Sequence, residues 1–125
     1  MESKKRVLAV DDDPVQLNLF KNILGHKYEI FTVNSASNAI NFLNANQVDI
    51  LLLDIAMPNI TGFDFLYDIR TIPSYIAVPI IIISGKTGQD FHSEAKKSTA
   101  FDVLGKPVDP DHLIAAIEKA LSVKS

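Results

Sequence analysis

The feature that most constrains the fold is a regular alternation of short apolar runs with stretches of helical period. Each run has the length and the β-branched or leucine-rich content of a strand. We assign strands to residues 6–10, 28–33, 49–53, 79–83 and 102–104. Strands that alternate with helices need right-handed crossovers, and they form a parallel sheet covered on both faces. The sequence therefore predicts a three-layer α/β protein.

The stretches between the strands carry apolar residues at helical spacing. These sets are Leu17, Phe20 and Leu24; Ala36, Ile40 and Leu43; Phe63, Leu66 and Ile69; and Leu113, Ile117 and Leu121. A further helix over 89–98 contains few apolar residues, so we expect it to pack lightly.

Three local signals predict where helices begin. Asp13-Pro14 and Asp109-Pro110 place an aspartate, which caps free backbone N–H groups, before a proline, which suits the first helical position. Asn34-Ser35 predicts a third cap. On this interpretation Asp13 begins a helix and has no chemical role.

Composition limits the class of protein. A chain of 125 residues that is 47% hydrophobic and 22% charged fits one globular domain, which we expect over 1–125 with its core at 5–123. The net charge of −3 gives no general attraction to nucleic acid, so we expect no direct nucleic-acid binding. The absence of cysteine excludes disulfides and thiolate sites.

The apolar runs are too short for export or for membrane insertion. Lys4, Lys5 and Arg6 precede an apolar run that ends at Val10, well short of a signal peptide. The longest apolar stretch, 75–83, contains a proline and is far shorter than a membrane span. We therefore expect a cytoplasmic protein that does not enter the membrane.

Polar residues follow the predicted strands. Asp11 and Asp12 follow the first strand, Asp54 the third, Ser84 the fourth, and Lys106 lies just after the fifth. In a parallel sheet these ends share one edge, which is where ligands bind in such folds. Each residue alone has an ordinary explanation, such as a solvated turn or a surface lysine. Their convergence on one edge predicts a site.

The chemistry of this set points to phosphoryl transfer. Neighbouring carboxylates repel by about 1–4 kcal/mol per pair, which favours proton uptake or a bound cation. Oxygen ligands select a hard ion, and Mg²⁺ suits a site that must also hold waters and a phosphate oxygen. With the ion present, a carboxylate can act as nucleophile and form an acyl phosphate. Lys106 and the Ser84 hydroxyl would then contact the other phosphoryl oxygens.

Four separated motifs resemble the receiver domain of two-component response regulators, including the single-domain chemotaxis regulators. They are Asp11-Asp12, Asp54 followed by Ile55-Ala56-Met57-Pro58, Ser84, and Lys106-Pro107. The resemblance covers essentially the whole chain. It implies a flavodoxin-like (βα)5 fold with strand order 2-1-3-4-5, and a cis peptide before Pro107.

The same resemblance implies the function and the role of each residue. Asp54 would accept a phosphoryl group from a histidine kinase or phosphotransfer protein, with Ser84 and Lys106 assisting. Mg²⁺ would take Asp12, Asp54 and the carbonyl of Ala56, with Asp11 acting mainly through water. The chain would catalyse only its own phosphorylation and dephosphorylation, and would switch the surface that binds an unidentified output protein or domain.

The chain departs from the family pattern at several positions. Val103 stands where many receivers carry an aromatic residue, so an aromatic rotamer switch cannot operate there. Ala56 and Lys86 occupy positions that tune the phosphoryl lifetime, and neither is a plausible base, so we expect slow self-hydrolysis. Ser84 replaces the commoner threonine and keeps the hydroxyl.

Two other functions remain open. The chain can be a phosphorylation-independent docking module of receiver type, which would keep the same charges. It can also be an aspartate-nucleophile phosphohydrolase, in which Asp11 and Asp13 would form the Asp-x-Asp motif and Asp109 or Asp111 would complete the metal site. A flavin site is excluded because the acidic first loop would repel its phosphate.

Overall fold

A computed structural model of the chain describes residues 4–54, 62–85 and 100–124. They include a five-stranded parallel sheet in the order β2-β1-β3-β4-β5. The strands are β1 (Arg6–Val10), β2 (Glu29–Val33), β3 (Ile50–Asp54), β4 (Ile80–Ser84) and β5 (Asp102–Gly105). The predicted parallel sheet and the strand order implied by the resemblance are both confirmed.

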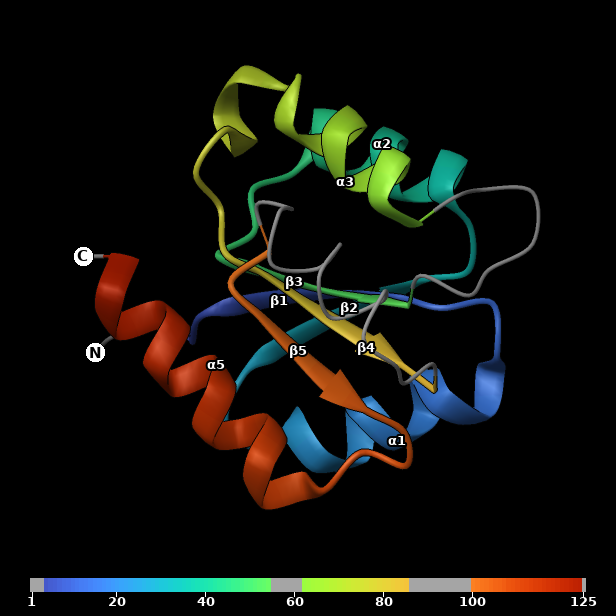
Figure 1. Ribbon diagram of the computed structural model, residues 1–125, viewed down its shortest axis with the longest axis vertical. Helices are drawn as coiled ribbons and strands as arrows, with labels where there is room; N and C mark the ends of the chain where they lie inside the picture. Colours follow the sequence, from blue (N-terminus) through green and yellow to red (C-terminus); the bar gives the residue numbers. More distant parts are fainter. Residues whose placement is uncertain (1–3, 55–61, 86–99, 125) are drawn as a thin grey trace.

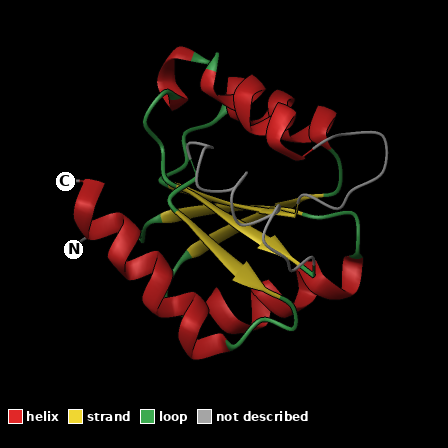
Figure 2. Ribbon diagram, viewed as in Figure 1, coloured by secondary structure: helices red, strands yellow, loops and turns green. Residues whose placement is uncertain are grey.

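Helices cover both faces of this sheet. They are α1 (Pro14–Leu24), α2 (Ala36–Ala45), α3 (Gly62–Arg70) and α5 (Pro110–Lys124), with a 3-10 helix η1 (Pro73–Tyr75). Figures 1 and 2 show α2 and α3 on one face and α1 and α5 on the other, which gives the predicted three layers. The helix expected over 89–98 lies outside the described residues. None of the described helices has the length and apolarity needed to cross a membrane.

The predicted helix starts are confirmed by side-chain caps. Asp13 Oδ1 accepts a hydrogen bond from the backbone N of Val15 at 2.9 Å, and Ser35 Oγ accepts one from Asn38 at 3.1 Å. Asp109 Oδ1 accepts one from the backbone N of Asp111 at 3.2 Å, at the start of α5. Each cap satisfies a backbone donor that the first helical turn leaves without a partner.

The sheet separates two hydrophobic clusters. Side chains point alternately to opposite faces of a strand, so Leu51 and Leu53 pack under α2 and α3, whereas Ile50 and Leu52 pack under α1 and α5. All four side chains are fully buried. The continuous apolar run before Asp54 is therefore a strand covered on both faces, as predicted.

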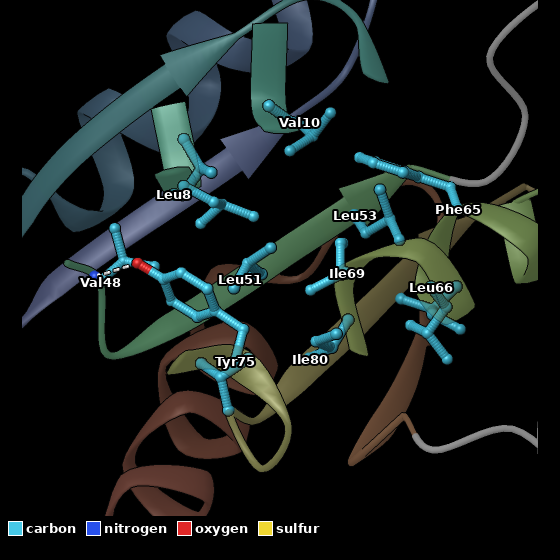
Figure 3. Close-up of a cluster of buried hydrophobic side chains, with 14 residues drawn as sticks. Leu8, Val10, Val48, Leu51, Leu53, Phe65, Leu66, Ile69, Tyr75 and Ile80 are labelled. Carbon is cyan, nitrogen blue, oxygen red and sulfur yellow. Dashed lines mark hydrogen bonds between the residues drawn. The ribbon is translucent and has the colours of Figure 1, made fainter. Parts of the chain in front are cut away.

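Tyr75 joins two loops at the end of the sheet where the strands begin. It is buried in the first cluster, and its hydroxyl accepts a hydrogen bond from the backbone N of Val48 at 3.2 Å (Figure 3). The same hydroxyl donates to the carbonyl oxygen of Asn46. Tyr75 thus ties the loop before β3 to η1, a helix that the sequence pattern did not predict.

We expect Tyr75→Phe to lower the free energy of unfolding by about 1–3 kcal/mol, because Val48 N–H and Asn46 C=O would lose a buried partner. Tyr67→Phe is the matched control, since Tyr67 is 71% exposed on α3. Urea unfolding of the two variants beside wild type measures the difference. Equal stability of both variants would show that the hydroxyl contributes nothing to the fold.

Candidate functional site

Three carboxylates meet where β1 and β3 end. Asp11 directly follows β1, Asp54 is the last residue of β3, and the two strands are hydrogen-bonded neighbours. One oxygen from each of Asp11, Asp12 and Asp54 lies within 4.8 Å of the others. Asp11 and Asp54 are buried, whereas Asp12 is exposed. The structure therefore brings together the three acids that the sequence placed on one edge.

The ammonium group of Lys106 lies between two of these acids. Its Nζ is 3.2 Å from Asp54 Oδ2, as a hydrogen-bonded ion pair, and 3.7 Å from Asp11 Oδ2. Lys106 reaches this position because it directly follows β5 and its backbone N donates to the carbonyl of Ser84 at 3.0 Å. The peptide bond between Lys106 and Pro107 is cis, as the resemblance implied.

Ser84 is the last residue of β4, the strand that lies between β3 and β5. It is buried, and it pairs in register with Gly105, the residue before Lys106. Ser84 therefore ends its strand on the same edge as Asp54, with Lys106 beside it. The predicted hydroxyl and cation are both at the acid cluster's end of the sheet.

Asp11 is held by the turn that leads into α1. Its Oδ1 accepts a hydrogen bond from the backbone N of Asp13 at 3.0 Å. The sequence analysis predicted only a capping role for Asp13 and missed this bond from its backbone N–H. An aspartate such as Asp11 that accepts a hydrogen bond from the residue two positions later is a recognised turn signal. Asp11 Oδ2 is buried and accepts no hydrogen bond from any residue that the structure describes.

Burial raises the pKa of Asp11 to about 6, and the nearby charge of Asp54 adds to the increase. The Asp13 N–H and the Lys106 ammonium oppose it because they favour the charged carboxylate. For Lys106, burial alone would lower the pKa, but the charges of Asp11 and Asp54 outweigh it and the pKa is raised. Lys106 is therefore a cation at neutral pH.

The chemistry of this donor set fits a hard divalent cation. The cluster offers carboxylate oxygens from three residues, including Asp11 Oδ2, which accepts no hydrogen bond from the described residues. Oxygen ligands of this kind suit Mg²⁺, which keeps several waters when it binds to proteins. The predicted ligand Ala56 and the predicted tuning residue Lys86 lie outside the described residues.

Of the acids that a phosphohydrolase site would need, only Asp11 belongs to the cluster found among the described residues. Asp13 and Asp109 cap α1 and α5, and neither belongs to the acid cluster. Asp111 is exposed in the first turn of α5 and is also outside the cluster. Within the described part of the chain, the candidate metal ligands are Asp11, Asp12 and Asp54.

The amino-acid sequence of the chain is similar to those of known proteins. A family model described as the response regulator receiver domain matches residues 7–118. The chain is 32% identical over 114 residues to an uncharacterised 14.6 kDa protein of Leptolyngbya boryana, covering 90% of this chain and 87% of that protein. It is 35% identical over 124 residues to the cyclic-nucleotide phosphodiesterase regA of Dictyostelium discoideum, but these are 95% of this chain and only 16% of that protein.

The fold is also similar to solved structures. The crystallised chemotaxis protein CheY4 of Vibrio cholerae matches with a TM-score of 0.89 and 28% identity, over 95% of this chain and 100% of that one. The fold and the order of strands are thus those of a group of known proteins.

We expect the stability of the metal-free protein to fall as Asp11 ionises. The pKa of Asp11 is about 6 in the folded chain and about 3.9 in an unfolded one, so between these values the folded state binds more protons. Its stabilising contribution is complete below about pH 4 and is lost as the pH rises through 6. The free energy of unfolding of Asp11→Asn, whose side chain stays neutral, should therefore exceed that of wild type by about 1–3 kcal/mol above pH 7 and by less near pH 4.

Urea unfolding in the presence of a chelator, from pH 4 to 8, measures this difference. Asp68→Asn is the control, because Asp68 is an exposed acid on α3. A difference between Asp11→Asn and wild type that does not change with pH would contradict the raised pKa.

Proposed function

The chain belongs to the response regulator receiver family, and on that basis we propose that it accepts a phosphoryl group on Asp54 in a Mg²⁺-dependent reaction. The observation that carries this proposal is the contact between Lys106 and Asp54 beside the acid cluster. Asp54 as candidate nucleophile, Lys106 as counter-charge and the clustered acids as candidate metal ligands thus lie within one site.

Asp54 is suited to be the nucleophile by its position. It ends a strand that is buried on both faces, so the ladder bonds of β3 fix its backbone. One of its carboxylate oxygens would attack the phosphorus of a phosphohistidine, forming a P–O bond while the P–N bond breaks. The electron pair goes to the leaving imidazole nitrogen, which takes up a proton from solvent. A histidine kinase or a phosphotransfer protein would supply this donor.

Lys106 and Ser84 would assist through the oxygens of the transferred group. In the phosphoryl-free site, Lys106 Nζ already lies 3.2 Å from Asp54 Oδ2. An ammonium at this distance can stabilise negative charge that develops on a phosphoryl oxygen. Ser84, one strand away from Asp54, carries the hydroxyl that would donate to another of these oxygens. We infer that both residues would move toward the phosphoryl group and change the loops that follow β4 and β5.

Asp11, Asp12 and Asp54 would hold the ion. Three carboxylates and one ammonium leave an excess of negative charge in a partly buried space, which a divalent cation would offset. A bound Mg²⁺ supplies Lewis acidity, reducing the repulsion between the acids and an incoming phosphoryl oxygen. The unidentified output partner would bind a surface that changes when Asp54 is phosphorylated. Val103, which is half-buried in β5, has no aromatic ring, so this change would occur without an aromatic switch at that position.

The proposal predicts that Asp54 alone takes up phosphate. We expect wild type and the control Asp68→Asn to gain one phosphoryl group from a small acyl phosphate or phosphoramidate donor with Mg²⁺, and Asp54→Asn to gain none. Intact-protein mass spectrometry and peptide mapping measure this. Uptake on Asp11 would favour the phosphohydrolase, and Mg²⁺ binding without any uptake would favour the docking module.

Binding of the ion should also stabilise the fold. A ligand at ten times its Kd adds about 1.4 kcal/mol to the free energy of unfolding. We expect millimolar Mg²⁺ to stabilise wild type and Asp68→Asn equally, and Asp12→Asn less, because Asp12 contributes one of the clustered oxygens. Urea unfolding with and without the ion tests this. A wild type that is indifferent to Mg²⁺ would count against the ion site and leave the nucleophile to be tested separately.

A further inference from the structure

The strand β2 forms an edge of the sheet. Among the described strands it pairs with β1 alone, and it lies at one end of the order β2-β1-β3-β4-β5. The backbone N of Glu29 donates to the carbonyl of Lys5, so Glu29 faces β1. Successive residues of a strand point their N–H and C=O groups to opposite sides, and those of Ile30 and Thr32 therefore point outward from this edge.

The segment that contains this edge carries no charge. Residues 30–48, the uncharged segment, comprise most of β2, all of α2 and most of the loop before β3. They include no Asp, Glu, Lys, Arg or His, although charged residues make up 22% of the chain. Depletion of charge is typical of the core of protein interfaces. The exposed polar residues of this segment are Asn34, Ser37, Asn38, Asn41, Asn44 and Gln47.

An aromatic pair lies beside the edge. The ring centroids of Phe31 in β2 and Phe42 in α2 are 5.2 Å apart, and both residues are half-buried. The guanidinium of Arg6 lies 4.8 Å from the centre of the Phe31 ring, and Glu29 offsets its charge from 4.0 Å. Natural edge strands avoid pairing with other chains through lysine, proline or a bulge. The strand β2 has one charged residue, Glu29 at its first position, no proline, and a continuous register with β1.

The edge is complementary to a second copy of itself. When two β2 strands run antiparallel about a two-fold axis at Phe31, Ile30 lies opposite Thr32 of the second copy, and the two residues can exchange both backbone hydrogen bonds. In this register Glu29 lies opposite Val33 of the second copy, so like charges are not directly opposed. A two-fold dimer uses the same surface twice, and a neutral surface meets its copy without repulsion. A charged partner would find no counter-charge on the uncharged segment.

We propose that a second copy of this chain docks on the β2 edge, with the two β2 strands antiparallel, so that two five-stranded sheets join into one. The neutral surface of α2 lies beside the contact. Because β1 separates β2 from β3, the contact does not depend on phosphoryl transfer at Asp54.

Self-association of the wild-type chain tests the partner. We expect sedimentation equilibrium to show reversible dimerisation. Amide exchange at Ile30 and Thr32 should slow as the protein concentration rises, because the second copy gives their N–H groups an acceptor, while Phe31 N–H, which faces β1, should change less. A wild type that stays monomeric at millimolar concentration would overturn the proposal, and an extended segment of another protein would then be the candidate for this edge. A dimer without slower exchange at Ile30 and Thr32 would also contradict it.

Charges placed beside the two-fold axis test the location. The two Thr32 residues would be diagonal neighbours about 7–8 Å apart. Thr32→Lys should therefore weaken dimerisation about tenfold through repulsion between like charges. Thr71→Lys is the matched control, since Thr71 is exposed beyond the end of α3.

An equimolar mixture of Thr32→Lys and Thr32→Glu should recover dimerisation, because opposite charges then lie beside the axis. Circular dichroism checks that the variants are folded, and the exchange measurement on wild type stands even if one is not. Equal weakening in Thr32→Lys and Thr71→Lys, or a mixture of folded variants that does not recover, would overturn the proposal.

Discussion

Burial of β3 on both faces is the constraint on which the rest of the structure depends. Four consecutive fully buried apolar side chains need cover above and below the sheet, and helices supply it from α2 and α3 on one face and α1 and α5 on the other. Because each crossover returns the chain to the same starting edge, the described strands are parallel and end together. The acids, the hydroxyl and the ammonium of the site therefore meet although they are far apart in the sequence. Asp11 and Lys106, for example, are more than 90 positions apart.

The features of the fold that the sequence predicts correctly are those set by local periodicity. The alternation of strands and helices and the caps at Asp13, Ser35 and Asp109 follow from side-chain spacing and local hydrogen bonding, and those that fall within the described residues are found. Strand ends differ by a residue, since ladder hydrogen bonds and not hydropathy determine where pairing stops: β3 includes Asp54 and β4 includes Ser84. The helix η1 escaped prediction because Pro73-Ser74-Tyr75 has no period, and Tyr75 is held by backbone groups distant in sequence.

For the site, strand ends predicted which side chains would meet but not how they would be charged. The buried position of Asp11, its bond from Asp13 N–H and its raised pKa depend on distances that only the folded chain provides. The same holds for Lys106, which could have been solvated and instead lies between two carboxylates.

The lengths and the register of the strands determine where the site residues lie along the edge of the sheet. β1, β3 and β4 each contain five residues, and in-register pairing aligns Val10 with Leu53 and Asp54 with Ile83. One residue inserted within β3 would exchange the two sets of buried side chains, because successive residues face opposite sides of a sheet. It would also push the carboxylate of Asp54 one step along the edge, away from Lys106. The connections between these elements are therefore where we expect an added or deleted residue to be tolerated, because a change of length there leaves the spacing within the strands intact.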